Sequence, residues 1–553
     1  MESRRQKRKQ GADFVIQGSI LAAASILVRI IGIAYRIPLI NIIGDEGMGY
    51  YGTAFNVYNI ALLLSSYSLP LAVSKLVASR LARGQYRNAA RIFHVALGYA
   101  TIAGGITAAV IWFGADFFAG EVFFMPYAAF ALKTLAPTVW IMAYLGVFRG
   151  YFQGRGTMVP TAMSQVFEQI INAVVSVAAG SILFQEAWKL EVLKDQTGTG
   201  YSNAWGAAGG TIGTGSGALG ALLLLMLLFL ICRPMIRRQR RRDRDSRPES
   251  RGRISKALLM TVVPVVLSSA VYNLNTVVDN GVLAANFNTL GRGDEFAGLW
   301  GVYTGKYHLL INVPMAVSSA LASSLIPSVT AAVAERNRKL VRERVSSAIR
   351  FSMMIAIPSA VGLTVLAGPI NNLLFSGDNE LAVRMTLYGS LAVVFYSLST
   401  VTNGILQGID RMRAPVFHAL ISLAVHLVFL EIMVLVLHLG IFSMVFANIV
   451  FAVSMTFLNH RTICRTLRYR QELKKTFLIP MISSAVMGAA AFFVCRLLSK
   501  TGHEAAALGG SILAAVLIYG ILYLRLGGLS AAELKSMPGG KKLYRIASAL
   551  RLI

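Results

Sequence analysis

The feature that most constrains this chain is an internal repeat. Three motifs occur twice, and the two copies of each motif are about 250 residues apart. The paired segments are 49–52 and 298–301, 69–74 and 313–318, and 150–154 and 404–408. A hydrophobic protein built from two similar halves is a common plan for transporters, because alternating access requires two helix bundles that move about a shared site. We therefore expect the functional site to lie between the two halves.

The chain is long and apolar enough to cross a membrane many times. Its 553 residues are 55% hydrophobic and only 14% charged, and the mean hydropathy is +0.61. Apolar runs near the length that a helix needs to span the hydrocarbon core recur along the sequence. The pattern predicts an all-α polytopic membrane protein with about fourteen transmembrane helices. The expected spans begin near residues 14, 50, 93, 124, 158, 205, 257, 299, 346, 381, 414, 440, 476 and 505.

Matching the repeat onto these spans predicts two six-helix lobes and a terminal pair of helices. The expected parts are an N-terminal lobe at 1–232, a basic cytoplasmic linker at 233–256, a C-terminal lobe at 257–460, and two further spans with a basic cytoplasmic tail at 461–553. The linker is rich in arginine and contains two prolines. Such a composition is typical of a solvated segment that lies against anionic lipid headgroups.

The net charge of +28 follows membrane topology and does not indicate a nucleic-acid surface. Basic residues gather at alternate connections between the expected spans, which is the bias that orients membrane helices. Acidic residues, among them Asp45, Glu121, Glu295 and Glu504, lie at the opposite connections. We therefore expect both termini in the cytoplasm, membrane lipids as neighbours, and no nucleic-acid partner.

No cofactor or metal site is indicated. The cysteines, Cys232, Cys464 and Cys495, lack the spacing of a zinc or redox motif. The glycine-rich run 206–220 has neither a preceding strand nor the Lys-Ser/Thr ending of a phosphate loop, so close helix packing explains it better. The first apolar stretch continues to about residue 43, too far for a signal peptide. Because the chain contains no nucleotide-binding cassette, we expect Na⁺, H⁺ or the membrane potential, and not ATP, to drive transport.

Arginines inside spans are the first candidates for function, because charged side chains are costly there and usually face a cavity or a partner. Arg29 and Arg36 lie in the first expected span, seven residues apart. Seven residues are nearly two helical turns, so both guanidinium groups project from nearly the same face. Two such groups suit a phosphate, which they can hold bidentately. In the alternative interpretation, Arg36 lies near the end of the span and reaches the headgroups.

Lys75 and Lys306 extend this basic set into the second and eighth expected spans. Each lies near a repeated segment whose proline, Pro70 or Pro314, is expected to break its helix and contribute to gating. Backbone groups freed by proline are tolerated where helices line a cavity. Lys75 lies only five residues before Arg80, so contact with the headgroups explains Lys75 as well as ligand contact does.

The acidic candidate is Asp279 in the seventh expected span, with Asn275 one helical turn before it. Carboxylate and amide oxygens suit Na⁺ or a proton relay, so we predict an ion-coupling site at these residues. A salt bridge from Asp279 to Lys306 or Arg29 explains the residue equally well. The two arrangements can also be alternate states of one transport cycle.

Four segments carry a resemblance to a known family. They are 25–38, 69–75, 149–154 and 160–169. These segments resemble the polysaccharide-biosynthesis flippases of Gram-positive bacteria, the group of stage V sporulation protein B and the MurJ-type lipid II flippases. That group belongs to the multidrug, oligosaccharidyl-lipid and polysaccharide exporter superfamily. The resemblance covers essentially the whole chain and implies two lobes that form a V around a central cavity, in a bacterial cytoplasmic membrane.

The resemblance also implies a substrate class, an undecaprenyl-diphosphate-linked sugar whose diphosphate is received by cationic cavity residues. Arg29 matches the family's first arginine in span 1. Tyr35 falls where Gram-negative relatives have an arginine, and Arg36 is displaced by one residue. Lys75 and Lys306 fall near the family's basic positions in spans 2 and 8. Spans 13 and 14 are associated in the family with a groove for the lipid tail.

The leading hypothesis is an alternating-access flippase, and not an enzyme, that moves lipid II or a related lipid-linked glycan to the outer leaflet for cell-wall synthesis. A V-shaped monomer needs no partner chain to make a cavity. One alternative is a cation-coupled multidrug exporter of the same superfamily, which the excess of intramembrane bases over acids disfavours. Another is a non-transporting scaffold for envelope or spore-wall assembly that recruits partners through the basic segment 237–253. The identity of the glycan and that of the coupling ion are open at this point.

Overall fold

A computed structural model describes the backbone of residues 2–195, 198, 200–243, 247–500, 502–529, 531, 534, 544–545 and 548–549. Within its helices, the side chains at 2–19, 22, 264–265, 267–274, 321–328 and 334 lie outside the described part. The described residues are almost entirely helical and include no strand, so the predicted all-α membrane fold is confirmed. Contacts divide the chain into two compact units, unit 1 (Met1–Gly305) and unit 2 (Lys306–Ile553).

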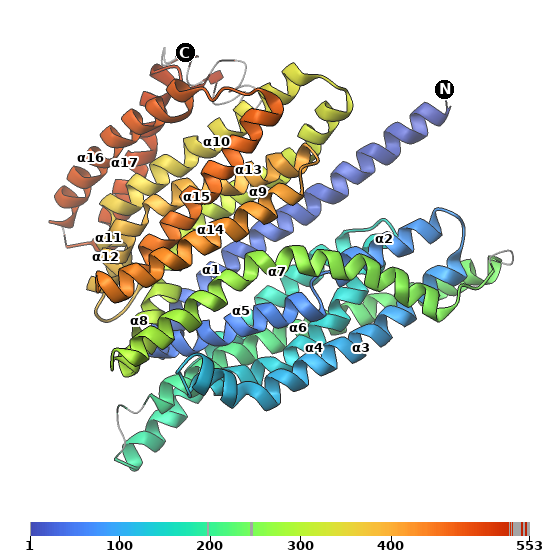
Figure 1. Cartoon of the computed structure of the whole chain (residues 1–553), viewed down its shortest axis with the longest axis horizontal. Coiled ribbons are helices and arrows are strands. Elements are labelled where there is room, and N and C mark those ends of the chain that lie inside the picture. The colour runs from blue at the N-terminus through green and yellow to red at the C-terminus, as the bar shows by residue number, and fades with distance from the viewer. Residues whose placement is uncertain are drawn as a thin grey trace. The chain divides into compact units, whose positions relative to one another are not determined.

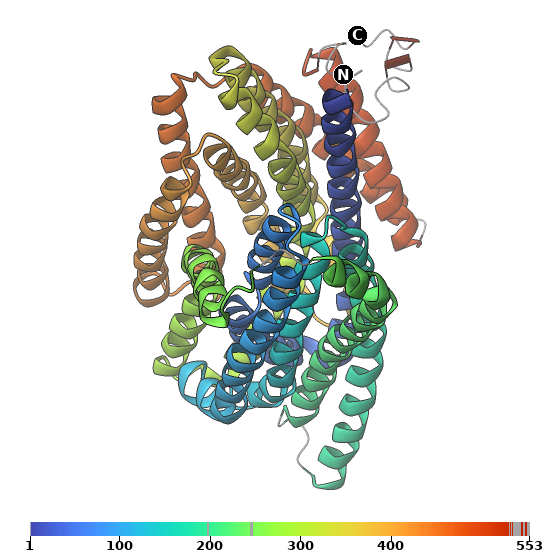
Figure 2. The ribbon, with the colours of Figure 1, turned by 90° about the vertical axis from the view of Figure 1, so that its right-hand side faces the viewer.

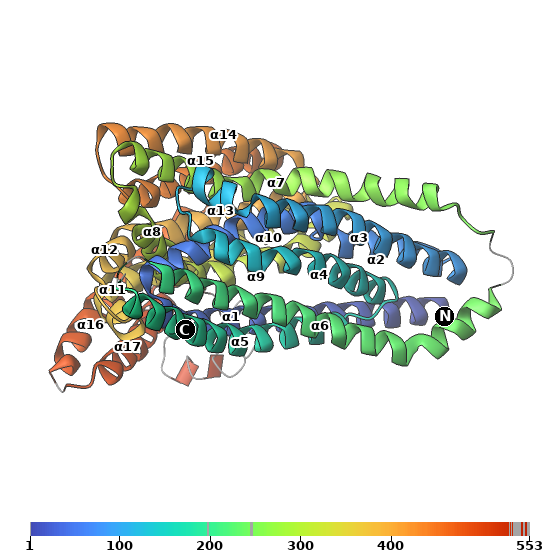
Figure 3. The same ribbon diagram turned by 90° about the horizontal axis from the view of Figure 1, so that it is seen from below.

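The helices of unit 1 are coloured blue to green in Figure 1. They are α1 (Glu2–Ser65), α2 (Leu69–Leu81), α3 (Tyr86–Phe117), α4 (Ala128–Gly154), α5 (Val159–Leu193), α6 (Tyr201–Arg242), α7 (Arg251–Thr289) and α8 (Gly293–Gly301). A π-helical turn, η1 (Phe118–Val122), follows α3, and another, η2 (Val302–Tyr307), follows α8. Figure 3 shows α3, α4, α5 and α6 running nearly parallel to one another.

The packing of α5 on α6 depends on glycine. A Cβ at Gly213 would lie 2.1 Å from Ser176 Oγ, and one at Gly209 would lie 2.4 Å from the carbonyl oxygen of Ala179. Because these positions carry no side chain, the two backbones approach closely. The glycine-rich run 206–220 is therefore a helix-packing surface, as predicted, and not a phosphate loop.

Helix α1 changes direction at Gly44, where the backbone has φ 70° and ψ 179°. Glycine adopts this conformation readily because it has no Cβ. A second interruption, the turn at 66–68, separates α1 from α2. Pro70 lies in the first turn of α2, where its missing N–H removes no helical hydrogen bond. The first apolar region, Ala23–Leu81, therefore contains two changes in backbone direction.

An aromatic cluster fills the core of unit 1 between α3, α4 and α6. The ring centroid of Phe93 lies 4.7 Å from that of Tyr151 and 5.0 Å from that of Phe229, and Phe148 packs edge-on against Phe93 and Phe229. Offset and edge-to-face aromatic pairs contribute energy beyond the burial of their area. This cluster fixes the spacing of the three helices near the end of unit 1 where α3 begins and α6 ends.

Unit 2 runs from yellow to red in Figure 1. Its helices are α9 (His308–Ala334), α10 (Arg338–Val365), α11 (Ala367–Leu374), α12 (Glu380–Gly389), α13 (Leu391–Gly408), α14 (Arg413–Glu431), α15 (Phe442–Leu467), α16 (Ile479–Ser499) and α17 (Glu504–Arg525), with π-helical turns η3 (Ile432–Val436) and η4 (Lys474–Leu478). Helices α16 and α17, the red pair in Figure 2, pack against each other. Their apolar side chains also pack against those of α10.

The described part of the chain contains ten helices that are long and apolar enough to cross a membrane. The number rises to eleven if α12 and α13, which are bent by 49° relative to each other, form one span. One of the ten is Ala23–Leu81, which the break at Gly44 divides. The chain is thus polytopic, and the total of fourteen spans stays a prediction.

The connection between α6 and α7 is shorter than the basic stretch 233–256 suggests. Helix α6 continues to Arg242 and α7 begins at Arg251, so most of the arginines lie on helices. Ser250 Oγ caps α7 by accepting a hydrogen bond from the backbone N–H of Arg253 at 3.3 Å. Along the chain, the boundary between the two compact units falls between Gly305 and Lys306, after α8. The repeat instead places the boundary between the lobes at the linker. The predicted lobe boundaries stay a prediction.

Candidate functional site

Arg29 and Arg36 both lie on α1 before the break at Gly44. The side chain of Arg29 is exposed, and so are its apolar neighbours Ile26 and Ile30, which are 50% and 58% accessible. Arg36 is half-buried. The two arginines therefore lie on one helix, and only Arg36 lies among other side chains of unit 1.

A network of polar side chains connects α1, α5 and α6 inside unit 1. Tyr35 Oη and Tyr51 Oη lie 3.2 Å apart, and Asn172 Nδ2 donates to Tyr35 Oη at 3.4 Å. Ser176 Oγ donates to Asn172 Oδ1 at 2.8 Å, and Thr214 Oγ1 donates to the same oxygen at 3.4 Å. We call these five residues the tyrosine–asparagine network. Hydrogen-bonded groups of this kind satisfy one another in the interior and hold their side chains in fixed positions.

The guanidinium group of Arg36 interacts with the hydroxyls of Tyr35 and Tyr51. These partners are neutral, so they orient the guanidinium without cancelling its charge. Sequence reasoning found Arg36 but not the network that holds it. The signal was present, because Tyr51 belongs to a repeated motif and Asn172 and Ser176 are polar residues one turn apart in a predicted span.

Arg149, on α4 inside unit 1, has a carboxylate partner. Its Nη2 lies 2.6 Å from Glu168 Oε2, and its Nε donates to Ser164 Oγ at 3.0 Å. Both charged side chains are mostly buried. The pair joins α4 to α5, so each charge has a structural partner.

Lys75 and Lys306 lie in different surroundings. Lys75 is on α2 and is exposed. Lys306 lies in the π-helical turn η2 and is 1% accessible, and its Nζ donates to Asn379 Oδ1 at 3.0 Å within unit 2. A buried ammonium is costly unless it donates to well-placed oxygens. The predicted convergence of Lys75 and Lys306 on one ligand stays a prediction.

The two repeated prolines differ in their effect on the helix. Pro70 begins α2 directly after a turn, so the chain is interrupted there. Helix α9, in contrast, runs from His308 through Pro314 without interruption. The irregular backbone in the second copy lies before α9, in η2. Pro314 is the seventh residue of α9, so its missing N–H removes one hydrogen bond of the helix without interrupting it.

Asp279 and Asn275 lie on α7 and are buried within unit 1. They are four residues apart, so they project from one face of the helix. Asn280 is also buried, and its Nδ2 donates to Thr53 Oγ1 of α1 at 3.0 Å. The carbonyl oxygen Oδ1 of Asn275 accepts no hydrogen bond from the described residues. A carboxylate and an amide oxygen on one buried helix face form the beginning of a cation site.

No group of three or more His, Cys, Asp or Glu side chains with metal-binding geometry occurs among the described residues. The predicted ion-coupling site therefore relies on amide oxygens beside a single carboxylate. Such a set suits a weakly bound monovalent cation or a proton better than a transition metal, which prefers nitrogen and sulfur ligands.

Comparisons with known proteins agree with this architecture. The family model of the lipid II flippase MurJ matches residues 86–512. Stage V sporulation protein B of Bacillus subtilis (strain 168) is 26% identical over 521 residues, which cover 94% of this chain and 96% of that protein. A solved structure of lipid II flippase MurJ in an inward closed conformation superposes with a TM-score of 0.64 at 15% identity, over 91% of this chain and 97% of that chain.

A second solved structure extends the likeness to the wider superfamily. The inward-facing conformation of a multidrug resistance MATE family transporter of the MOP superfamily superposes with a TM-score of 0.60 at 17% identity, over 82% of this chain and 99% of that chain. At these identities the structural matches show a shared fold. The fold is the one that the sequence resemblance implies.

Proposed function

Because the chain belongs to the lipid II flippase MurJ family, we propose that it moves lipid II, or a closely related undecaprenyl-diphosphate-linked glycan, from the inner to the outer leaflet. Members of this family are multi-pass transporters of the plasma membrane, and not enzymes. The observation that supports an anionic substrate is Arg36, an arginine inside a span whose partners are neutral hydroxyls.

The diphosphate engages Arg29 and Arg36 first in this proposal. Hydrogen bonds between guanidinium and phosphate are stronger than bonds between neutral groups, and they gain further strength where water is excluded. The tyrosine–asparagine network keeps Arg36 in place before the substrate arrives, which lowers the cost of ordering it. Lys75 and Lys306 supply further positive charge, while the lipid tail remains in the bilayer.

A cation gradient or the membrane potential resets the transporter, and Asp279 with Asn275 provides the coupling. The two side chains share a buried helix face. Binding of Na⁺ or H⁺ there neutralises a buried carboxylate and so favours one state of the cycle over the other. No cofactor takes part, and one chain forms the complete transporter.

The similarity to stage V sporulation protein B supports a second version of the same activity. In that version the chain carries a lipid-linked glycan during sporulation instead of lipid II during growth. The chemistry of recognition is unchanged, because the diphosphate and the polyprenyl chain are common to both substrates. Only the sugar and peptide part differs.

The experiment is complementation in a bacterial host whose own lipid II flippase is depleted, with lipid II exposed on the outer leaflet as the readout. We expect the wild-type chain to restore exposure and the double variant Arg29→Gln/Arg36→Gln to abolish it. Arg292→Gln is the control, because Arg292 is an exposed arginine whose ion-pair partner is Glu295 in the first turn of α8.

If the inserted double variant exposes as much lipid II as the wild-type chain does, the proposed diphosphate site is wrong. If the inserted wild-type chain gives no lipid II exposure, the assay is repeated with a sporulation-stage lipid-linked glycan. Failure with both substrates contradicts the flippase and favours the scaffold, which predicts loss of function when 237–253 is deleted. Export of a cationic drug that depends on Asp279, in contrast, favours the multidrug exporter.

A further inference from the structure

A groove at the basic end of unit 1 lies between α3, the end of α6 and the beginning of α7, with a volume of about 1080 Å³. Its lining changes in character along α3, from Arg87 and Arg91 at one end to Gly98 and Ile102 further along. The distance from residue 87 to residue 102 along a helix is about 22 Å. The groove is therefore cationic at one end and apolar along most of its length.

The cationic end is built from three segments of the chain. Arg91 comes from α3, Arg240 from α6 and Arg251 from α7, and all three line the groove. Arg91 Nη1 donates to the carbonyl oxygen of Glu249 at 2.8 Å, which fixes its position. In the part of the chain that the structure describes, no hydrogen bond or ion pair engages the side chains of Arg240 and Arg251. Their charge is therefore available to an anion.

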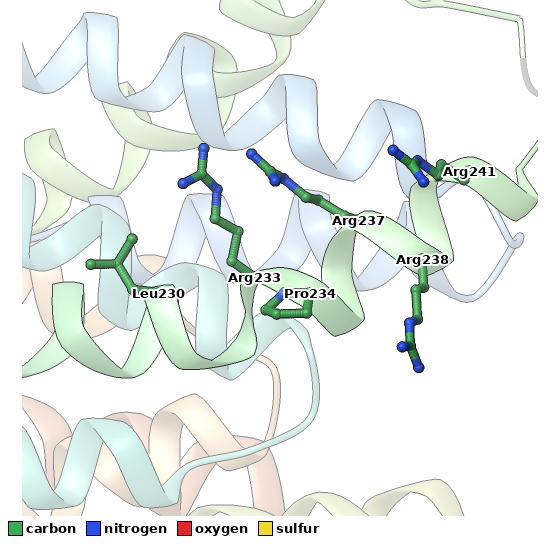
Figure 4. Close-up of a pocket in the computed structure, with 6 residues that line it drawn as sticks. All are labelled: Leu230, Arg233, Pro234, Arg237, Arg238 and Arg241. Carbon is green, nitrogen blue, oxygen red and sulfur yellow. The ribbon is translucent and has the colours of Figure 1, made fainter.

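A second cavity of about 440 Å³ lies between α3, α4 and α6 and shares Arg240 with the groove. Arg233 and Arg237 line it together with the aromatic cluster. Figure 4 shows Arg233 and Arg237 projecting from one side of α6, whereas Arg238 projects from the opposite side. The basic residues of α6 are thus divided between two faces, and only one face borders α3.

The apolar part of the groove is open. A Cβ at Gly98 would have no atom within 4 Å, so the floor of the groove is free at that position. Ile102 on α3 is 66% accessible and Leu259 on α7 is 43% accessible. Exposed apolar side chains beside a cluster of arginines match an elongated molecule with an anionic head and a hydrocarbon chain.

We propose that this groove binds an anionic phospholipid. The phosphate lies among Arg91, Arg240 and Arg251, and one acyl chain follows α3 past Gly98 toward Ile102. A soluble anion leaves the apolar walls uncovered, and a zwitterionic lipid brings a positive group toward the arginines, so charge complementarity selects the anionic lipid. The proposal concerns unit 1 alone and does not depend on which substrate the protein transports.

The test measures lipid binding to the purified full-length protein in neutral detergent by native mass spectrometry, with phosphatidylglycerol and phosphatidylcholine as probes. We expect wild type to retain phosphatidylglycerol in preference to phosphatidylcholine. The double variant Arg240→Gln/Arg251→Gln loses about thirtyfold in phosphatidylglycerol affinity, because each basic residue near the headgroup contributes about 1 kcal/mol. Gly98→Leu keeps the full charge and loses about tenfold, because it excludes about two methylene groups of the chain.

The matched control is Arg238→Gln/Arg253→Gln. It removes the same charge from the same two helices, at positions that do not line the groove. We expect its phosphatidylglycerol affinity to stay within about twofold of wild type, because charges outside the groove are screened. Thermal unfolding in neutral detergent shows that each variant is folded.

Equal losses in the two double variants would mean diffuse attraction to a basic surface and would overturn the proposal. Wild-type affinity in Gly98→Leu overturns it as well, because the chain then does not follow α3. Glycerol 3-phosphate serves as a competitor without a chain. If it displaces phosphatidylglycerol at the lipid's own concentration, the site binds the anionic head alone and the lipid proposal fails.

Discussion

Arg36 and Arg149 are both arginines inside helices of unit 1, and they differ in their partners. Arg149 Nη2 lies 2.6 Å from the carboxylate of Glu168. Arg36 lies beside the hydroxyls of Tyr35 and Tyr51. A carboxylate cancels the charge of a guanidinium, whereas a hydroxyl leaves it in place. The partner of such an arginine therefore indicates its role. An arginine paired with a carboxylate stabilises the fold, whereas one beside hydroxyls is available to a ligand.

The comparison predicts the largest loss of stability at Arg149. In Arg149→Ala, the mostly buried Glu168 carboxylate loses its partner, which costs about 3 kcal/mol of unfolding free energy. Thermal unfolding in detergent measures the change. The double variant Arg149→Ala/Glu168→Ala regains part of the loss, because it leaves no buried charge unpaired. If the single and the double variant are equally stable, the pair does not act as a structural ion pair.

At Arg36 we expect a small loss of stability and a large loss of transport. Arg36→Gln removes a charge that no carboxylate of a described residue balances, so the free energy of unfolding changes by less than about 1 kcal/mol. Transport falls by about tenfold to a hundredfold, because a hydrogen bond to a charged group is worth roughly 1.5–3 kcal/mol. The measurement is outer-leaflet exposure of the substrate at equal protein levels. Arg36→Lys sharpens the result, because it keeps the charge and loses the planar fork.

The network around Arg36 predicts a smaller effect. Tyr51→Phe removes one hydroxyl from the contact with Tyr35 and leaves the ring packed against Phe55. We expect transport to fall about fivefold, the value of one neutral hydrogen bond of about 1 kcal/mol. Tyr58→Phe is the matched control, because Tyr58 packs on the same Phe55 ring. Equal losses in both variants would mean that the aromatic ring, and not the hydroxyl of Tyr51, positions the arginine.

The sequence predicted the membrane fold well because hydropathy and repeats report on long segments. The apolar runs identified a polytopic all-α protein, and the glycine-rich run was interpreted as helix packing. That reasoning did not indicate the ion pair between Arg149 on α4 and Glu168 on α5. Positive-inside arguments consider only position along the chain, so they miss a carboxylate that packing brings near.

The candidate site was less predictable for the same reason. Arg36 was found because a charge in a span is conspicuous, but the network that holds its tyrosine partners comes from segments far apart in the sequence. Asn172 lies 137 residues from Tyr35, and nothing in a single sequence indicates that contact. Pro314 shows a local limit, because α9 continues through this residue although proline lacks the N–H of one helical hydrogen bond. The linker shows another limit of sequence reasoning, because contacts with α2 and α3 hold its two ends in place.

Arg80 and Glu249 extend the comparison to the connection between α6 and α7, where the smallest effect is expected. Arg80 Nε and Nη2 each lie 3.0 Å from a carboxylate oxygen of Glu249, which fastens the α6–α7 connection to α2. The hydrogen bond from Arg80 holds the pKa of the Glu249 carboxyl below its usual 4.5. Because the folded-state pKa is the lower one, the stabilisation is complete above about pH 4.5 and is lost as the pH falls through the folded-state value.

Glu249→Gln should therefore lower the unfolding free energy by about 1 kcal/mol or less near neutral pH, because the amide oxygen of glutamine still accepts a hydrogen bond from Arg80. Thermal unfolding of the variant and wild type, compared from neutral pH down to pH values below 4.5, measures the effect. We expect the two curves to converge in acid, where wild-type Glu249 also becomes neutral. A difference that persists unchanged in acid would show that the shape of the connection, and not the charge of Glu249, fastens it to α2. In that case a carboxylate partner at the α6–α7 connection would not distinguish a structural arginine as it does between α4 and α5.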